Sequence, residues 1–280
     1  MQSPSSLLDI VVHRLLSGGA ILPAFDINAY KIQEEALKDE PDIQVIERLI
    51  SQDQALTGQV LKLANSAFYK GLNKVSTVKN AVIRLGTREI SNIVLLVSQK
   101  SNYRASSAIY RKMMDTLWRH SVGCAVGSHW IAKLARAAEI AHEAFFAGLL
   151  HDIGKLLLLA VIDASRKSGE IPEDPSPELI DEVIGNLHAE YGCRLLETWN
   201  LPEKYAVVVR DHHISPFDTA NRLLTMVRLA DLACNKLGIG LRPTPDLLLT
   251  GTVECEQLGI SEIEIAQLEI KLEDSISLSQ

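Results

Sequence analysis

Histidine and aspartate are the residue types in this sequence whose number and placement suggest chemistry. The candidates, in chain order, are His120, the pair His151-Asp152, His188, the pair His212-His213, and Asp231. Imidazole nitrogens and carboxylate oxygens together suit Zn, Fe, Mn, Co or Ni, and this mixed set excludes a thiolate site. The spacings are irregular, so the pattern by itself does not define a metal site. The sequence around each candidate is more informative.

The pair His151-Asp152 lies in sequence typical of a protein core. The apolar run AFFAGLL precedes the pair, and the run LLLLAV follows Lys155. Burying a carboxylate in such surroundings is costly unless a metal ion, a lysine or a protonated histidine neutralises it. Lys155 follows His151 by four residues on the same helix face, where it could hold a phosphate or the aspartate itself. Asp231 also lies between apolar residues, so the candidates indicate one shared polar centre.

Each candidate also has a purely structural interpretation. A single histidine on an apolar helix is usually hydrogen-bonded within the core, which applies to His120 or His188 taken alone. The pair His212-His213 could instead mark a solvated helix end, because cations suit the carboxyl end of the helix dipole. His120 is followed by the small residues Gly123 and Gly127, a face that lets another helix come close.

The elements that must position these side chains are predicted to be helices. Apolar residues recur with helical spacing, as at Val78, Ala81, Val82 and Leu85, and we find no sustained alternation typical of strands. The sequence therefore predicts an all-α fold. Thr77 is a predicted cap for the helix that begins at Val78.

Breaks in the apolar rhythm divide the chain into three predicted parts. The helical spacing of apolar residues is interrupted by small polar residues near 100–108, by three prolines at 168–177, and by glycines and prolines at 238–245. We therefore expect an N-terminal helical region over 1–104, a central helical core over 105–240 that carries the candidate site, and an acidic C-terminal helical extension over 241–280.

Composition narrows the classes of function. The 280 residues carry 28 basic and 35 acidic side chains, and seven of the acids but only one lysine follow Gly251. This charge balance lacks the excess of basic residues that is typical of nucleic-acid-binding proteins, so no nucleic-acid partner is expected. The longest stretch free of charged residues, 120–132, is too short to span a bilayer, so no membrane segment is expected.

The expected location is the cytoplasm. The N-terminus has no basic segment before its apolar stretch and carries Asp9, so it does not resemble a signal peptide. The four cysteines lie far apart without a CxxC pair, which favours a reducing compartment.

The segment GLLHDIGK, residues 148–155, resembles the signature of the HD superfamily of metal-dependent phosphohydrolases. More specifically, the chain resembles HDOD proteins, the HD-related output domain of bacterial signalling. The segments that carry this resemblance lie within about residues 15–240 and are 50–69, 78–90, 117–121 and 188–203. The resemblance implies an all-α fold with an N-terminal helical region packed on an HD-like helical core.

The resemblance also implies a ligand set. Catalytic HD proteins hold a metal with a histidine, an adjacent His-Asp pair and a later aspartate, and the related HD-GYP phosphodiesterases add histidines for a second metal. One or two divalent transition-metal ions (Fe, Mn, Zn, Ni or Co) are therefore expected, with Asp152 as the bridging carboxylate and Lys155 facing a substrate phosphate. The matching positions here are His120, His151, Asp152 and Asp231 for the first ion, and His188, His212 and His213 for the second.

The sequence departs from the HD-GYP pattern in two places. The residues after His213 read ISPFDTANR, without the GYP signature, and Thr116 stands where some of these enzymes carry glutamate. Hydrolysis of cyclic di-GMP is therefore poorly supported.

Three functions remain open from the sequence. The first is a signal-transduction protein with a protein partner and a metal-binding core of little catalytic activity. The second is an active metal-dependent phosphohydrolase that acts on a nucleotide or phosphate ester, with Asp152 and Lys155 as catalytic residues. The third is a metal-free interaction scaffold. A complete set of metal ligands can also persist in a protein as a structural cross-link, because a metal that binds only the folded state adds stability.

Overall fold

The structure is a computed structural model that describes residues 6–18, 22–69, 71 and 73–279. Every regular element among these residues is a helix, which confirms the predicted all-α fold. The α-helices are α1 (Leu7–Leu16), α2 (Ile27–Ala36), α3 (Ile43–Ser51), α4 (Gln54–Ala64), α5 (Val78–Leu85), α6 (Thr87–Lys100), α7 (Ala108–Leu134), α8 (Ala141–Leu150), α9 (Ile153–Ser168), α10 (Pro177–Thr198), α11 (Glu203–Asp211), α12 (Arg222–Lys236), α13 (Val253–Leu258) and α14 (Glu262–Ser275); three short 3₁₀ turns are η1 (Ala138–Ile140), η2 (Leu249–Gly251) and η3 (Ile276–Leu278).

Local sequence decides where several of these helices begin. Thr77 caps α5 as predicted, because its side chain accepts a hydrogen bond from the backbone N–H of Asn80. Asp26 caps α2 in the same way. Gly86 joins α5 to α6 with a φ of 84°, a conformation that favours glycine.

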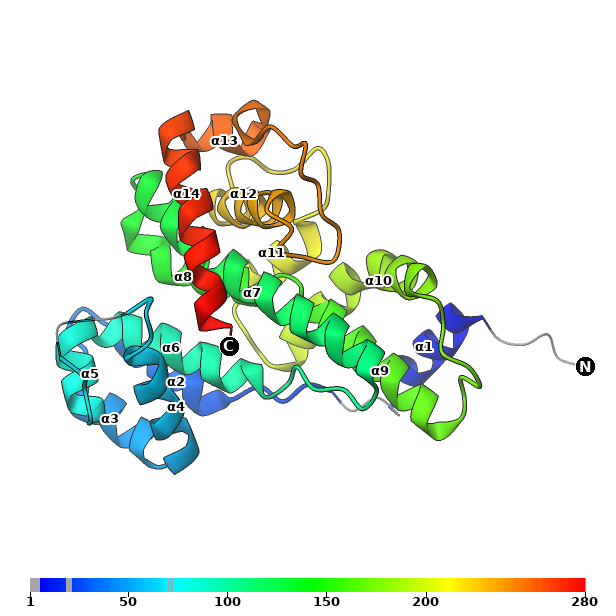
Figure 1. Cartoon of the computed structure of the whole chain (residues 1–280), viewed down its shortest axis with the longest axis horizontal. Helices are drawn as coiled ribbons and strands as arrows, with labels where there is room; N and C mark the ends of the chain where they lie inside the picture. Colours follow the sequence, from blue (N-terminus) through cyan, green and yellow to red (C-terminus); the bar gives the residue numbers. More distant parts are fainter. Residues whose placement is uncertain (1–5, 19–21, 70, 72, 280) are drawn as a thin grey trace, which may run out of the picture.

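The helices α2 to α6 form an N-terminal region that packs on the core, as Figure 1 shows in blue and cyan. Helix α6 makes the contact with α8, and His142 Nδ1 lies 3.3 Å from Asn92 Oδ1 across this junction. The predicted packing of an N-terminal helical region on an HD-like core is thereby confirmed. Helix α1 lies apart from α2 to α6, against α9, where Arg14 hydrogen-bonds to Ser165. The residue boundaries of the three parts remain a prediction.

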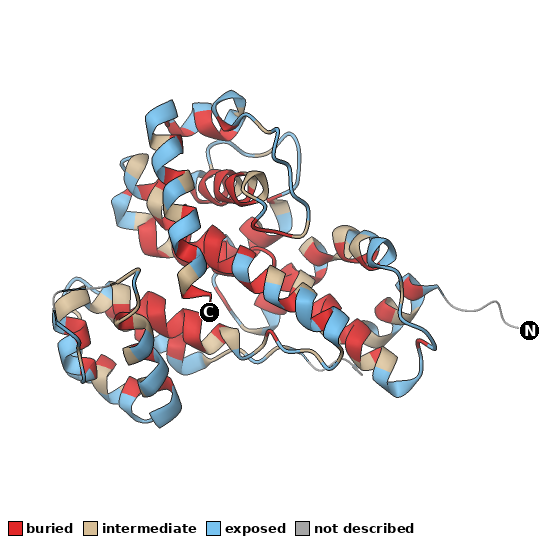
Figure 2. Ribbon diagram, in the orientation of Figure 1, coloured by how far each residue is buried: buried red, intermediate tan, exposed pale blue. Residues whose placement is uncertain are grey.

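The long helix α7 is the centre of the fold and packs against α8, α9, α12 and α14 (Figure 1). Figure 2 shows buried residues in red along this helix, and the stretch 120–129 is buried throughout. The small-residue face predicted on this helix receives α12: a Cβ at Gly123 would lie 2.9 Å from Cys234 Sγ, and one at Gly127 would lie 3.1 Å from Ala230 Cβ. The close approach of another helix to this face is confirmed.

One segment, residues 138–168, is long and apolar enough to cross a membrane by length and composition alone. Its most apolar window is 89% buried inside the fold. The segment contains η1, α8 and α9, which pack as core helices around the candidate site. A search restricted to stretches free of charged residues does not find this segment, because it contains charged side chains.

Two histidines outside the candidate site predict a loss of stability in acid. The rings of His129 and His142 lie 4.8 Å apart, and burial lowers the pKa of each to about 4. An unfolded histidine takes up its proton near pH 6.5, so the unfolded state gains protons first as the pH falls from about 7 to 5. We expect a smaller free energy of unfolding at pH 5 than at pH 7, measured by urea denaturation. The double variant His129→Gln/His142→Gln should show a smaller difference; an equal one would contradict this assignment.

Candidate metal centre

The seven predicted ligand residues come from five parts of the chain and lie together in the core. His120 lies on α7, the pair His151-Asp152 forms the turn between α8 and α9, and His188 lies on α10. The pair His212-His213 follows α11, and Asp231 lies on α12. Their ligand atoms fall into two groups, and within each group these atoms lie within 4.8 Å of one another.

Two glycines let the helices that carry these residues approach closely. A Cβ at Gly154 would lie 1.9 Å from the carbonyl oxygen of His188, so α9 and α10 touch backbone to backbone. A Cβ at Gly148 would lie 2.5 Å from the carbonyl oxygen of Cys124, which brings α8 against α7. Both contacts draw the turn at His151-Asp152 toward its neighbours.

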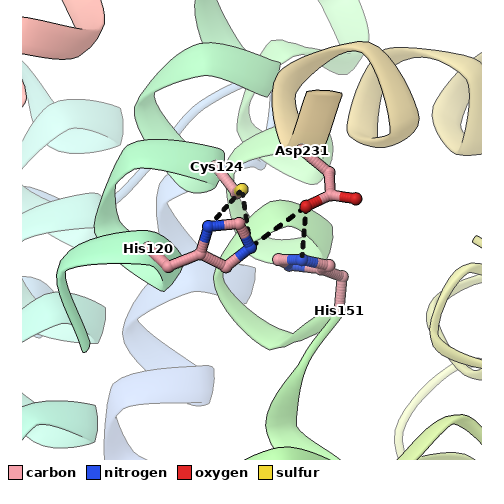
Figure 3. A group of neighbouring side chains, drawn as sticks. All are labelled: His120, Cys124, His151 and Asp231. Atoms are coloured by element: carbon pink, nitrogen blue, oxygen red, sulfur yellow. Dashed lines mark hydrogen bonds and ion pairs between the residues drawn. The ribbon is translucent and has the colours of Figure 1, made fainter. Parts of the chain in front are cut away.

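The first group contains His120, Cys124, His151 and Asp231 and is drawn in Figure 3. His120 Nε2 lies 3.1 Å from Asp231 Oδ1, and His151 Nε2 lies 4.0 Å from the same oxygen. Asp152 faces this group with its Oδ2 atom, 3.3 Å from His120 Nε2 and 3.4 Å from His151 Nε2. Two imidazoles and two carboxylates therefore surround one point.

The second group contains Asp152, His188, His212 and His213. Asp152 Oδ1 lies 3.3 Å from His212 Nε2 and 3.6 Å from His188 Nε2, and these two nitrogens are 3.4 Å apart. The ring of His213 lies 4.0 Å from that of His212, at the exposed side of the group. The two carboxylate oxygens of Asp152 thus face different groups, the geometry that a bridging ligand requires.

Backbone carbonyls orient the buried imidazoles. The Nδ1 atoms of His120, His151, His188 and His212 lie 2.7–2.9 Å from the carbonyl oxygens of Ile239, Gly148, Ile184 and Val209. Each Nδ1–H donates to its carbonyl, which leaves the Nε2 lone pair directed at the carboxylates. A lone pair and a carboxylate oxygen repel each other unless a proton or a metal ion lies between them. The donor set therefore fits a divalent metal.

Two buried polar atoms of the site have no hydrogen-bond partner among the described residues, His151 Nε2 and Asp152 Oδ1. Their side chains are fully buried, so water does not replace the missing partner at the surface. Buried polar atoms are costly to leave unsatisfied. One atom faces the first group and the other faces the second, so a cation in each group would satisfy both.

The electrostatics of the site favour ionised carboxylates and lower the pKa of two of its imidazoles. Burial raises the pKa of Asp152, but Lys155 and His151 outweigh it and hold that pKa well below its usual value. Burial lowers the pKa of His188 to about 4 and that of His213 to about 3. His120 is the exception: burial lowers its pKa, yet hydrogen bonds to Asp152 and Asp231 raise it well above the usual value. The two carboxylates therefore favour a positive charge at His120.

Lys155 pairs with Asp152 and also lines a cavity beside the site. Its Nζ lies 2.7 Å from Asp152 Oδ2, so it neutralises the aspartate. It also lines a cavity of about 250 Å³ that opens onto Asp152, His120, His188 and His213. A ligand in this cavity would contact the metal-facing residues and the ammonium group together.

Sequence reasoning missed three residues that shape this site. Cys124 lies one helical turn after His120, with Sγ 3.6 Å from His120 Nε2, a spacing that could have drawn attention to it. Burial and a hydrogen bond to Cys234 raise the pKa of this thiol well above its usual value, so it is a neutral thiol. Asn235 donates a hydrogen bond to Asp231 Oδ1 at 2.8 Å. Arg242 lines the cavity and forms an ion pair with Asp181 at 2.8 Å.

Comparison with known proteins gives this arrangement its context. The HDOD domain family matches residues 22–215. An uncharacterised protein of Treponema pallidum is 31% identical over 185 residues, 64% of this chain and 35% of that protein. The protein YuxH of Bacillus subtilis, also uncharacterised, is 29% identical over 87 residues, 31% of this chain and 21% of YuxH. The matches thus span about a third or less of these curated relatives.

Solved structures share the fold over nearly the whole chain. An HDOD domain protein of unknown function from Geobacter sulfurreducens has a TM-score of 0.77 at 22% identity, covering 97% of this chain and 96% of that one. A candidate metal-dependent phosphohydrolase from Shewanella amazonensis has a TM-score of 0.70 at 20% identity, covering 98% and 97%. A candidate signal transduction protein from Marinobacter aquaeolei has a TM-score of 0.69 at 19% identity, covering 99% and 66%.

Proposed function

The chain belongs to the HDOD family, and from that premise we propose that it is a bacterial signal-transduction protein whose helical core binds one or two divalent transition-metal ions. The observation that carries this proposal is Asp152, a buried carboxylate whose two oxygens face two separate clusters of imidazole nitrogens. His120, His151, Asp152 and Asp231 would hold one ion; Asp152, His188, His212 and His213 would hold the other. Iron, manganese, zinc, nickel and cobalt all suit this donor set.

The proposed role of the metal is to tie the core helices together. The ligand side chains come from α7, the turn before α9, α10, the end of α11, and α12, so a bound ion would cross-link all of them. Ligands that bind only the folded state stabilise it by mass action. A cytoplasmic regulatory module would then present a rigid surface to a protein partner, and neither nucleic acid nor a membrane enters this proposal.

A second candidate function is hydrolysis of a nucleotide or another phosphate ester, and the 250 Å³ cavity specifically favours it. Metal ions supply a polarised phosphate oxygen and an activated water to such reactions. In this chain Lys155 would hold a phosphate oxygen through its ammonium group, and Asp152 would keep that ammonium in place. The imidazole of His213, on the exposed side, would contact the ligand at the cavity wall.

The metal itself gives the first test. Protein purified without chelator is expected to contain at least one equivalent of a transition metal by elemental analysis. Removing it with a chelator should lower the melting temperature by roughly 5–10 °C, since a ligand at about 100 times its Kd stabilises by about 2.7 kcal/mol and each kcal/mol moves a chain of this size by about 2–4 °C. Adding back the same metal should restore the temperature. Metal-free protein with an unchanged melting temperature would reject the proposed centre.

Activity separates the two candidate functions. Metal-loaded protein is assayed with generic phosphodiesters, phosphomonoesters and nucleotides, beside the variant Lys155→Gln. Turnover that Lys155→Gln reduces at unchanged metal content would establish the phosphohydrolase. Metal binding without turnover on this panel is the result expected for the regulatory module.

A further inference from the structure

A larger cavity lies outside the metal centre, where the N-terminal region meets the core. Its volume is about 620 Å³, within the range of small-molecule sites. Four segments form its wall: α4, the end of α6 with residues 101–104, the α7 segment 115–119, and the C-terminal residues from 276 to 279. In Figure 1 the segment that follows α14 ends close to α6 and α7. We call it the junction cavity.

The wall of the junction cavity is basic. Lys100, Arg104 and Arg119 line it, and Asp115 is its one acidic side chain. Lys62 lines a smaller adjoining cavity of about 120 Å³ that shares the wall at Lys100. This accumulation of positive charge stands out because the whole chain carries a net charge of −7.

The arginines of this wall are available to a ligand. Arg119 hydrogen-bonds only within its own helix among the described residues, to the carbonyl oxygen of Asp115 at 3.3 Å and to Thr116 Oγ1 at 3.4 Å. Neither Arg104 nor Arg119 forms an ion pair with a carboxylate of the described residues. Burial and the nearby charge of Lys62 lower the pKa of Lys100, and the nearby carboxylate of Asp115 acts in the opposite direction.

The floor of the junction cavity is rigid. The rings of Tyr103 and Trp118 lie 4.9 Å apart, and both side chains are buried. Tyr103 Oη lies 3.0 Å from Ser121 Oγ, and Trp118 Nε1 donates to the carbonyl oxygen of Ser279 at 3.1 Å. The polar ends of both rings are thus satisfied within the protein, so they do not compete with the basic side chains for a ligand.

We propose that the junction cavity binds a small molecule that carries phosphate groups, held by Lys100, Arg104 and Arg119. Guanidinium groups suit phosphate oxygens because they donate two parallel hydrogen bonds. A small molecule is favoured over an acidic segment of a protein because residues from four chain segments line the same space of about 620 Å³. Such a ligand would contact α6 of the N-terminal region and α7 of the core together, and would therefore stabilise their contact.

This site is independent of the metal centre. Arg119 and His120 are neighbours on α7, but the arginine is exposed while the imidazole is buried and faces Asp231. A ligand in the junction cavity is therefore expected to bind metal-free protein. Failure of the proposed metal site leaves this proposal intact.

Inorganic pyrophosphate is the probe, titrated by calorimetry into metal-free protein at constant ionic strength. We expect saturable binding that Arg119→Gln weakens about tenfold, the effect of losing one charge-assisted contact. Lys112→Gln is the matched control, because Lys112 is an exposed cation on α7 outside the cavity. This control should change the affinity less than about twofold. Arg104→Gln provides a second variant in the wall, and circular dichroism checks that each variant is folded.

Four results would overturn the proposal. One is the absence of saturable binding of pyrophosphate. Another is an equal loss of affinity in Arg119→Gln and Lys112→Gln, which would mean that binding depends on the general surface charge. The third is loss of binding in Lys155→Gln, which would move the phosphate to the metal centre. Binding of a polyglutamate peptide without binding of pyrophosphate would instead assign the cavity to an acidic protein segment, and would also reject the small molecule.

Discussion

Replacing Asp152 with alanine is expected to remove at least one equivalent of bound metal and to destabilise the core. Its two oxygens are the atoms that face both histidine groups, and among the described residues no other single side chain serves both. The substitution also leaves the Lys155 ammonium without its partner at 2.7 Å. Breaking a buried ion pair by removing one member costs about 3–5 kcal/mol. Elemental analysis and urea denaturation measure the two effects on the same preparation.

Asp163→Ala is the matched control for this experiment. Asp163 is another buried aspartate on α9, where it accepts hydrogen bonds from the backbone and hydroxyl of Ser106. This variant should lose stability as well, yet it should keep the full metal content.

Unchanged metal stoichiometry in Asp152→Ala would reject the bridging role, and any hydrolytic activity that survives Asp152→Ala would eliminate the proposed site as its source.

Gly154→Ala is expected to have the second large effect, a loss of about 3 kcal/mol or more in the free energy of unfolding. The added Cβ would lie 1.9 Å from the carbonyl oxygen of His188 and 2.9 Å from the backbone N of Gly192. Both neighbours are backbone atoms, so α9 and α10 must move apart and the imidazole of His188 must move with its helix. We therefore also expect weaker metal binding, measured by titration with a metal chelator.

Gly58→Ala makes the same chemical change where there is room for it. Gly58 lies on α4, and a Cβ there would meet no atom within 4 Å. Alanine is a better helix former than glycine by about 1 kcal/mol, so this variant should be more stable than the parent. The two substitutions should therefore have opposite signs in urea denaturation. Equal or higher stability of Gly154→Ala would show that the contact between α9 and α10 is not as close as described.

The local features of the fold follow from residues that are close in the sequence. Apolar residues at helical spacing produce α5, and the Thr77 side chain caps it through the amide of Asn80, three residues away. The turn at His151-Asp152 also reads as a core segment because apolar runs flank it. Interactions of this kind span one or two helical turns, which is why the helical class and the candidate side chains could be predicted.

Contacts between distant residues were outside the reach of that reasoning. Helix α1 packs on α9 through the hydrogen bond of Arg14 to Ser165, 151 residues later in the chain. The mixed set of imidazoles and carboxylates excluded a thiolate ligand, although Cys124 lies beside His120 in the core. The junction cavity likewise joins Arg104 and Arg119 to the C-terminal residues, and no sequence pattern links these segments.

Residues that are close in the chain are enough to predict the helices, the resemblance to the family, and the order of the histidines and aspartates. The packing of distant helices determines that Asp152 presents one oxygen to each histidine group and that the carbonyl of Ile239, 119 residues away, orients His120. The physical reason is that helix formation depends on neighbouring residues, whereas the direction of a ligand lone pair depends on how separate helices pack. Close contacts at glycine, such as Gly154 against His188, set that packing.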